Sequence, residues 1–144
     1  MLVKEAMSRD VRTVSPETSL QEAARIMLES DVGSLPVGKD DRLVGMITDR
    51  DIAVRGVAAG KPPTVQVREV MSEEVKYCFE DENTASIAAN MAQQQVRRLP
   101  VVDRNKRLVG ILALADLATV AKSGHASAAL SGISQRGGAH SQAR

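Results

Sequence analysis

VKEAMS at residues 3–8 returns as VREVMS at residues 67–72. Other stretches recur in the same order: LPV at 35–37 and 99–101, RLVG at 42–45 and 107–110, and DIA and DLA at 51–53 and 116–118. Identities that keep their order over a whole unit indicate a tandem duplication, and the period is too long for a solenoid. The sequence therefore predicts repeat 1 over residues 1–60, a linker over 61–66 and repeat 2 over 67–121.

Each repeat has the same alternation of predicted strands and helices, inferred from apolar spacing and turn residues. In repeat 1 the order is a strand at 11–14, a helix at 19–29, hairpin strands at 34–37 and 43–47, and a helix at 49–59. In repeat 2 it is a strand at 75–78, a helix at 84–95, hairpin strands at 99–102 and 108–112, and a helix at 114–120. Pro36 and Pro100 are expected at strand ends, because proline donates no backbone hydrogen bond.

These elements predict an α/β (α+β) fold in which each repeat is a small three-stranded sheet with two helices. The helix at 19–29 is expected to bury Leu20, Ala23, Ala24 and Met27 on one face. One such unit has too small a core to be stable alone. We therefore expect two pseudo-symmetric repeats packed sheet to sheet.

Composition narrows the class of partner. The chain has 144 residues, a net charge of +1 and 1% aromatic residues, which argues against nucleic acid as a partner. No apolar stretch is long enough to cross a membrane, and the N-terminus lacks the apolar run of a secretion signal, so a cytoplasmic location is predicted. Residues 122–144 form a Ser-, Gly- and Ala-rich tail, expected to be disordered or loosely packed, or to dock through a turn at Leu130 and Ile133.

Nothing in the sequence indicates catalysis or a metal site. Cys78 is the single cysteine and is expected to be a half-buried strand thiol. His125 and His140 both fall in the polar tail. Because there is no nucleophile paired with a base, no cluster of metal ligands and no glycine loop that cradles phosphate, we expect neither enzymatic activity nor a catalytic cofactor.

The repeated motifs resemble the cystathionine-beta-synthase (CBS) domain. The matching features are the VxxxM lead-in, a helix ending near Met27 or Met91, the LPV strands and the LVGxxxxxD stretch, present twice over residues 3–121. The pair resembles a Bateman module and is similar to small stand-alone CBS-pair proteins of bacteria. The resemblance implies binding of an adenine nucleotide (AMP, ADP or ATP) or S-adenosylmethionine in clefts between the repeats, a homodimer formed through helical faces, and regulation of a partner protein.

The ligand signature of such modules is a Gly, a hydrophobic residue, any residue, Ser or Thr, two more residues and then Asp. Repeat 1 fits it with GMITDRD at 45–51, whereas repeat 2 fits only in part with GILALAD at 110–116, because Ala113 lacks the hydroxyl. The resemblance implies that Asp51 accepts hydrogen bonds from the ribose hydroxyls and that Thr48 donates to a phosphate. Asp116 is the counterpart candidate in repeat 2.

Thr48 and Asp51 also fit a capping box, which would only satisfy the first amides of a helix. From the residues alone the cap is the preferred interpretation, and the resemblance shifts the preference to ligand binding at Asp51. Asp116 persists although position 113 is alanine, which argues that this acid is not merely half of a reciprocal cap. A lone acid in a first turn still gains about 0.3–1 kcal/mol from the helix dipole, so this comparison leaves both interpretations of Asp116 open.

Arg97 and Arg98 precede LPV in repeat 2, where repeat 1 has Gly33 and Ser34. In the nucleotide-sensing kinase subunits of the family, basic residues at these places contact phosphates. The resemblance therefore suggests one composite anion site made from this basic pair and the hydroxyl motif of repeat 1, with the second site degenerate. The alternative is a solvated pair of charges beside an edge strand.

The predicted function is a non-catalytic regulatory module that binds an adenosyl ligand and signals through a change in conformation or in its dimer. The alternative is a ligand-free structural or stress-response interaction protein with degenerate sites. The missing hydroxyl at Ala113 keeps that alternative open.

Overall fold

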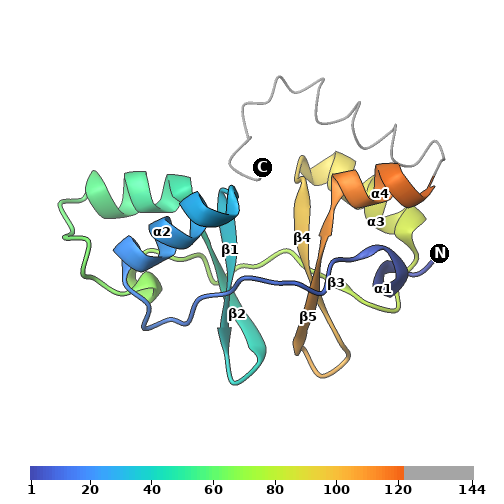
Figure 1. Cartoon of the computed structure of the whole chain (residues 1–144), viewed down its shortest axis with the longest axis horizontal. Coiled ribbons are helices and arrows are strands. Elements are labelled where there is room, and N and C mark those ends of the chain that lie inside the picture. The colour runs from blue at the N-terminus through green and yellow to red at the C-terminus, as the bar shows by residue number, and fades with distance from the viewer. Residues whose placement is uncertain (122–144) are drawn as a thin grey trace. The chain divides into compact units, whose positions relative to one another are not determined.

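The computed structural model describes residues 1–121, with side chains as far as residue 117, and divides the chain into two compact units (Figure 1). Among the described residues, unit 2 contains Arg12–Val75, and unit 1 contains Met1–Val11 together with residues 76–121. The units therefore do not coincide with the sequence repeats. The lead-in of repeat 1, residues 3–8, belongs to the unit that holds the strands of repeat 2, and the lead-in at 67–72 belongs to the unit that holds the strands of repeat 1.

Unit 2 is a hairpin packed against helices. Its elements are α2 (Leu20–Ser30), β1 (Ser34–Lys39), β2 (Arg42–Thr48), η1 (Asp51–Val57) and η2 (Val67–Glu69). β1 and β2 pair antiparallel, and the turn between them is made by Asp40 and Asp41, which both have positive φ, as a two-residue hairpin turn requires. The predicted hairpin is confirmed, and the helix predicted at 19–29 is displaced by one residue.

The apolar face of α2 supplies much of the core of unit 2. Leu20, Ala23 and Met27 are buried as predicted, together with Ile26. The prediction for Ala24 is wrong, because this side chain is exposed. The helix buries these residues against a set contributed by the hairpin and by the second lead-in: Leu35, Val37, Ile47, Val67 and Val70.

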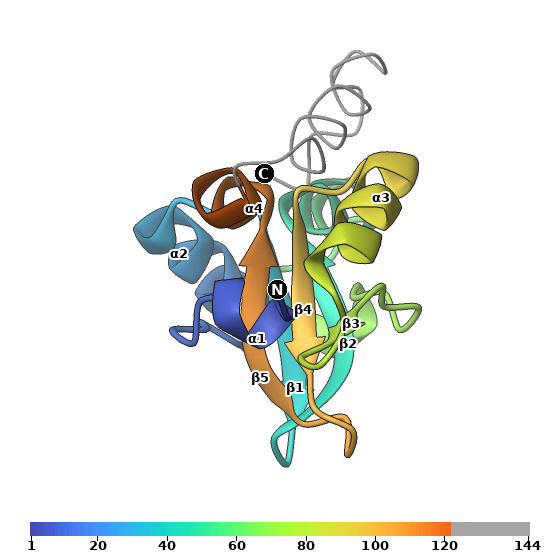
Figure 2. The same cartoon turned by 90° about the vertical axis from the view of Figure 1, so that its right-hand side faces the viewer.

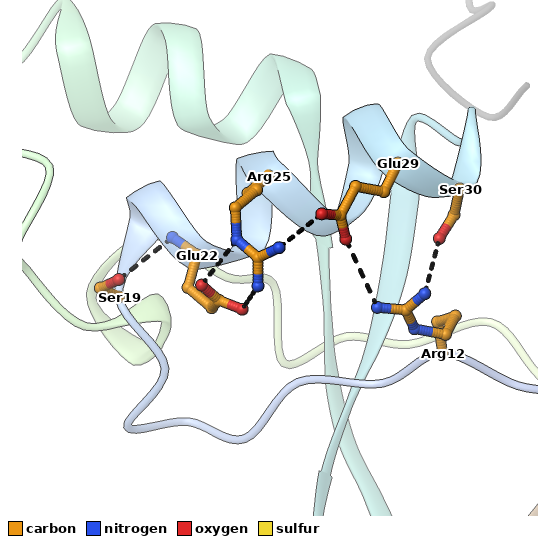
Figure 3. Close-up of polar contacts among 6 residues, drawn as sticks. All are labelled: Arg12, Ser19, Glu22, Arg25, Glu29 and Ser30. Atoms are coloured by element: carbon orange, nitrogen blue, oxygen red, sulfur yellow. Dashed lines mark hydrogen bonds and ion pairs between the residues drawn. The ribbon is translucent and has the colours of Figure 1, made fainter.

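The outer face of α2 carries a chain of charges (Figure 3). Ser19 caps the helix by accepting the backbone N–H of Glu22 at 3.1 Å, while the Glu22 carboxylate pairs with Arg25 instead of returning to the cap. Arg25 also pairs with Glu29, which lies 3.9 Å from Arg12. The Arg25 guanidinium hydrogen-bonded to Glu22 lowers the pKa of that carboxyl. These groups are exposed, so they hold the segment at Arg12 beside the helix without dominating stability.

The strand predicted at 11–14 is reduced to a single parallel bridge between Val14 and Val37, so the hairpin of unit 2 has two full strands and not three. Val14 donates to the Pro36 carbonyl at 3.1 Å and accepts from the Gly38 amide at 2.9 Å. A parallel ladder would continue through the amides of residues 36 and 16, and both are proline. The missing donors on either side of the bridge explain why it does not grow into a strand.

Pro36 lies within β1 and Pro100 within β4 (Arg98–Val102), so the prediction that they mark strand ends is wrong. Pro36 faces Met46 of β2, whose own amide and carbonyl pair with Ser72 instead. The missing N–H of Pro36 therefore points away from β2, and its absence costs the hairpin no hydrogen bond.

Unit 1 holds a three-stranded sheet in the order β3-β4-β5. Its elements are α1 (Val3–Ala6), β3 (Cys78–Phe79), α3 (Thr84–Gln94), β4, β5 (Leu108–Ala113) and α4 (Leu114–Ala121). β3 runs parallel to β4, and Glu80, at the position that is Pro16 in repeat 1, donates its amide to Val102 at 2.9 Å. This additional donor accounts for a short strand here where repeat 1 forms only a bridge. Figure 2 shows α1 beside β5.

Each lead-in is hydrogen-bonded to a strand, at the strand residue that directly follows a glycine. Ser72 exchanges two hydrogen bonds with Met46 in unit 2, and Ser8 exchanges two with Ile111 in unit 1, at 2.8–2.9 Å. A Cβ at Gly45 would lie 2.9 Å from the Ser72 carbonyl oxygen, and one at Gly110 would lie 2.8 Å from the Ser8 carbonyl oxygen. The glycine of the predicted ligand signature is therefore required by close backbone approach.

Cys78 is buried at 1% exposure in β3, and not half-buried as predicted. Burial, with a smaller effect from Glu82, raises the pKa of its thiol to about 12. Because the thiolate is the reactive form, a thiol reagent at pH 8 is expected to leave the native chain unlabelled over a period that fully labels the chain in urea. Labelling of the native chain at the urea rate would contradict this burial.

The raised pKa of the Cys78 thiol also makes the stability of the native chain depend on pH. An unfolded thiol ionises near its ordinary value, whereas the native thiol resists ionisation until about pH 12. The stability that comes from keeping this thiol neutral is therefore intact below the unfolded pKa and is lost as the pH rises toward the native value.

Among residues 1–121, no helix is both long enough and apolar enough to span a bilayer. The same part of the chain contains no group of three or more His, Cys, Asp or Glu side chains that could hold a metal ion. The predictions about His125, His140 and the turn at Leu130 and Ile133 lie outside the described residues.

Candidate functional site

Thr48 and Asp51 meet where β2 ends and the helical segment containing η1 begins. The Asp51 amide donates to the Thr48 hydroxyl oxygen at 3.0 Å, and the Thr48 amide donates to Asp51 Oδ2 at 3.0 Å. Both hydrogen bonds of a capping box are therefore present. The Asp51 side chain is 19% exposed, so it is turned toward the backbone and not into bulk water.

The box leaves hydrogen-bonding capacity at both side chains. The Thr48 oxygen accepts in the box, so its own hydroxyl proton remains able to donate to another group. A carboxylate offers about four acceptor positions, and the box uses one of them. Capping and ligand binding by this pair are therefore compatible, and the cap alone does not decide between them.

Asp116 makes the same cap without a hydroxyl partner. Its Oδ2 accepts the backbone amide of Ala113 at 2.9 Å, as Asp51 does from Thr48. The persistence of Asp116 beside Ala113 therefore does not argue against a cap, because the bond that Asp116 makes needs only the backbone of residue 113. Its role in ligand binding stays a prediction. What repeat 2 lacks is the second bond of the box, in which the backbone amide of the acid donates to a side-chain hydroxyl oxygen.

Arg55 extends the site in unit 2. Its Nη1 lies 4.0 Å from Asp51 Oδ1 and donates to the carbonyl of Met71 at 3.3 Å. Met71 belongs to the second lead-in, and its sulfur lies against Gly45 at the start of the signature. The acid at position 51 is thus bounded by its own cap on one side and by a guanidinium on the other.

The backbone of Arg97 and Arg98 lies beside residues 113 and 114 in unit 1, at the junction that Asp116 caps. Arg98 begins β4 and pairs with Ala113, and the Arg97 carbonyl accepts the Leu114 amide at 2.8 Å. The corresponding places beside Thr48 are held by Gly33 and Ser34. The structure thus groups Thr48 with Asp51 in unit 2, and groups Arg97, Arg98 and Asp116 in unit 1. The composite site stays a prediction.

Unit 2 also contains an open cavity of about 370 Å³ between α2 and the start of the helix after β2. Its lining consists of Ala24, Met27, Leu28, Asp31, Val32, Asp49 and Ile52. None of the predicted nucleotide-binding residues lines it. Its two charged residues are both acidic, so its chemistry does not suit a phosphate.

Comparison with known proteins gives the family. The family model of the CBS domain matches residues 3–56 and 67–123. The chain is 45% identical over 135 residues to the CBS domain-containing protein YhcV of Bacillus subtilis, covering 93% of this chain and 96% of that protein. These shares show that the likeness extends over nearly the full length of both proteins.

Two solved structures have the same fold. The crystal structure of Hypoxic Response Protein I with two coordinated zinc ions has a TM-score of 0.74 and 38% identity, covering 83% of this chain and 98% of that one. The CBS domain pair of protein MJ0100, in complex with 5′-methylthioadenosine and S-adenosyl-L-methionine, has a TM-score of 0.71 and 31% identity, covering 85% and 96%. The fold, the paired motifs and these relatives together show that this chain belongs to the CBS domain family and carries two copies of the domain.

Proposed function

We propose that this CBS pair is a non-catalytic regulatory module that binds an adenine nucleotide or a related adenosyl ligand. In this proposal Asp51 accepts from the ribose hydroxyls and Thr48 donates to a phosphate. The observation that carries it is the half-buried capping box, which leaves the Thr48 proton and most acceptor positions of Asp51 available. The binding of adenosyl compounds by the CBS pair of MJ0100 supports this class of ligand.

Regulation follows if the ligand favours one arrangement of the protein over another. The predicted homodimer remains part of the proposal. Leu28 on α2 is 81% exposed and Val57 on η1 is 69% exposed, and an interface through helical faces would cover such apolar surface. We also propose that the module acts in the cytoplasm.

A thermal-shift screen with AMP, ADP, ATP, S-adenosylmethionine and NAD tests the proposal. A ligand at 100 times its dissociation constant is expected to stabilise the native chain by about 2.7 kcal/mol. Asp51→Asn retains an oxygen that accepts the Thr48 amide but removes the charge, so the shift is expected to disappear while the cap remains.

Asp116→Asn is the matched variant, because it changes the equivalent cap in repeat 2. We expect it to reduce the shift less than Asp51→Asn, since its junction lacks the hydroxyl. A full shift in Asp51→Asn would exclude Asp51 from the site. No shift with any member of the panel would favour the ligand-free interaction protein.

The basic pair is tested separately. We propose that Arg98 contacts the ligand phosphate together with Arg97, and Arg98→Ala is then expected to weaken nucleotide affinity by about tenfold or more, the cost of a charge-assisted hydrogen bond. Isothermal titration of wild type and variant measures it. Unchanged affinity would assign Arg98 to the solvated pair beside the sheet.

A further inference from the structure

Arg55 is held next to the Asp51 carboxylate by two contacts. It follows Asp51 by one helical turn, its Nη1 lies 4.0 Å from Asp51 Oδ1, and the same nitrogen donates to the Met71 carbonyl at 3.3 Å. A guanidinium carries several N–H donors in a rigid fork. Within residues 1–121, the bond to Met71 is the hydrogen bond that the structure gives this side chain, which is 52% exposed. Donors of Arg55 therefore remain for a ligand that binds beside Asp51.

The equivalent junction of repeat 2 lacks this cation. The residue that follows Asp116 at the same spacing is Val120, and position 113 is alanine. The hydroxyl and the guanidinium are thus absent together from repeat 2, whereas the acid and its backbone cap are present in both. The cap accounts for the shared acid and for the Thr48 hydroxyl of repeat 1, and it does not account for the guanidinium of Arg55.

The Thr48 hydroxyl and the Arg55 guanidinium can both donate hydrogen bonds to an oxyanion. A carboxylate alone repels a phosphate, because both are negative. A guanidinium at 4.0 Å offsets that charge and offers charge-assisted hydrogen bonds to an oxyanion. In a nucleotide whose ribose hydroxyls are bound to Asp51, only the sugar ring and C5′ separate those hydroxyls from the 5′-phosphate. A cation next to the carboxylate therefore lies within the length of one bound nucleotide.

We propose that Arg55 is a specificity-determining residue, which makes the Thr48–Asp51 site select adenosyl ligands that carry a 5′-phosphate over those that do not. The inference rests on the proposed function and names its ligand class. An uncharged thioether such as that of 5′-methylthioadenosine gains nothing from the guanidinium, and the sulfonium of S-adenosylmethionine is repelled by it.

Isothermal titration of the full chain with AMP and with 5′-methylthioadenosine tests this inference. Wild type is expected to bind AMP about tenfold more tightly or better, and Arg55→Ala is expected to lose about tenfold or more of its AMP affinity. Its affinity for 5′-methylthioadenosine should change by no more than about twofold, within the range of a lost surface contact. Arg55→Lys, which keeps the charge but not the fork, should fall between wild type and Arg55→Ala.

Arg42→Ala is the matched control, because it removes one positive charge from the opposite end of β2, about 20 Å from Thr48 for a strand of this length. It should leave both affinities unchanged. Binding of 5′-methylthioadenosine also reports whether Arg55→Ala, which loses its bond to Met71, still has a native site.

Three results would overturn the inference. They are equal wild-type affinities for the two ligands, an unchanged AMP affinity in Arg55→Ala, and an equal loss for both ligands in that variant. Binding of neither ligand by wild type would instead reject the proposed function, and the inference with it. If Arg55→Ala does not fold, the wild-type preference and the result for Arg55→Lys decide.

Discussion

Val3→Ala is expected to destabilise unit 1, which holds the strands of repeat 2, although Val3 belongs to repeat 1 in the sequence. Val3 is 0% exposed and lies in the core with Ile87, Met91 and Leu112. Truncation of a fully buried aliphatic side chain costs about 2–3 kcal/mol. Hydrogen exchange of amides in β4 and β5 should accelerate by about thirtyfold or more, since this free energy sets the population of open states.

Val67→Ala is the matched variant, because Val67 occupies the same place in the second lead-in and is also 0% exposed. It lies in the core of unit 2, so exchange should accelerate in β1 and β2 instead. The pair of variants therefore makes opposite predictions for the two sheets. Greater acceleration in β1 and β2 than in β4 and β5 by Val3→Ala would contradict the exchanged packing of the lead-ins.

Gly110→Ala is expected to cost about 2–3 kcal/mol, the upper part of the range for overpacking. The added Cβ would lie 2.8 Å from the Ser8 carbonyl oxygen and 2.5 Å from the Met7 sulfur. The sulfur can move, but the carbonyl belongs to the hydrogen bonds between Ser8 and Ile111, so the lead-in must shift away from β5. Urea denaturation followed by circular dichroism measures the loss.

Gly38→Ala serves as the control for this prediction. Its added Cβ would meet the Arg42 carbonyl oxygen at 3.6 Å, an ordinary contact, so a change within about 0.5 kcal/mol is expected. If Gly110→Ala is as stable as Gly38→Ala, the close approach of the first lead-in to β5 is incorrect.

Much of the fold could be predicted from apolar spacing and turn residues. The helices beginning near Leu20 and Thr84 and both hairpins lie where the pattern places them, because these elements are specified by local spacing. The exchange of the lead-ins could not be predicted in this way. Residues 3–8 and 67–72 are so alike that each offers the same valine and methionine to either sheet, and local sequence does not say which one it joins.

The strand expected at 11–14 does not form, and the reason is visible only in the register of the pairing between Val14 and β1. Its apolar residues suit a strand, but the rungs on either side of Val14 require amides at Pro16 and Pro36. The register of a parallel bridge depends on tertiary contacts. The composition of one short segment therefore could not show the fault.

At the candidate site, the cap at Asp51 could be predicted, and the contacts of Asp116 and Arg55 could not. The sequence shows only that position 113 has no hydroxyl side chain, whereas the partner of Asp116 is the backbone of that residue. The i,i+4 spacing of Asp51 and Arg55 is visible in the sequence and is the signal that could have included Arg55. Its bond to Met71 depends on the exchanged lead-in and has no local signature.

A crystal structure of the chain with bound AMP would show whether Thr48 and Asp51 hold the ligand. We expect the ribose hydroxyls to lie within hydrogen-bonding distance of the Asp51 carboxylate and the phosphate to lie near the Thr48 hydroxyl. The capping bond from the Thr48 amide should be retained. AMP bound at another place, with no contact to Thr48 or Asp51, would show that this pair is a helix cap and nothing more.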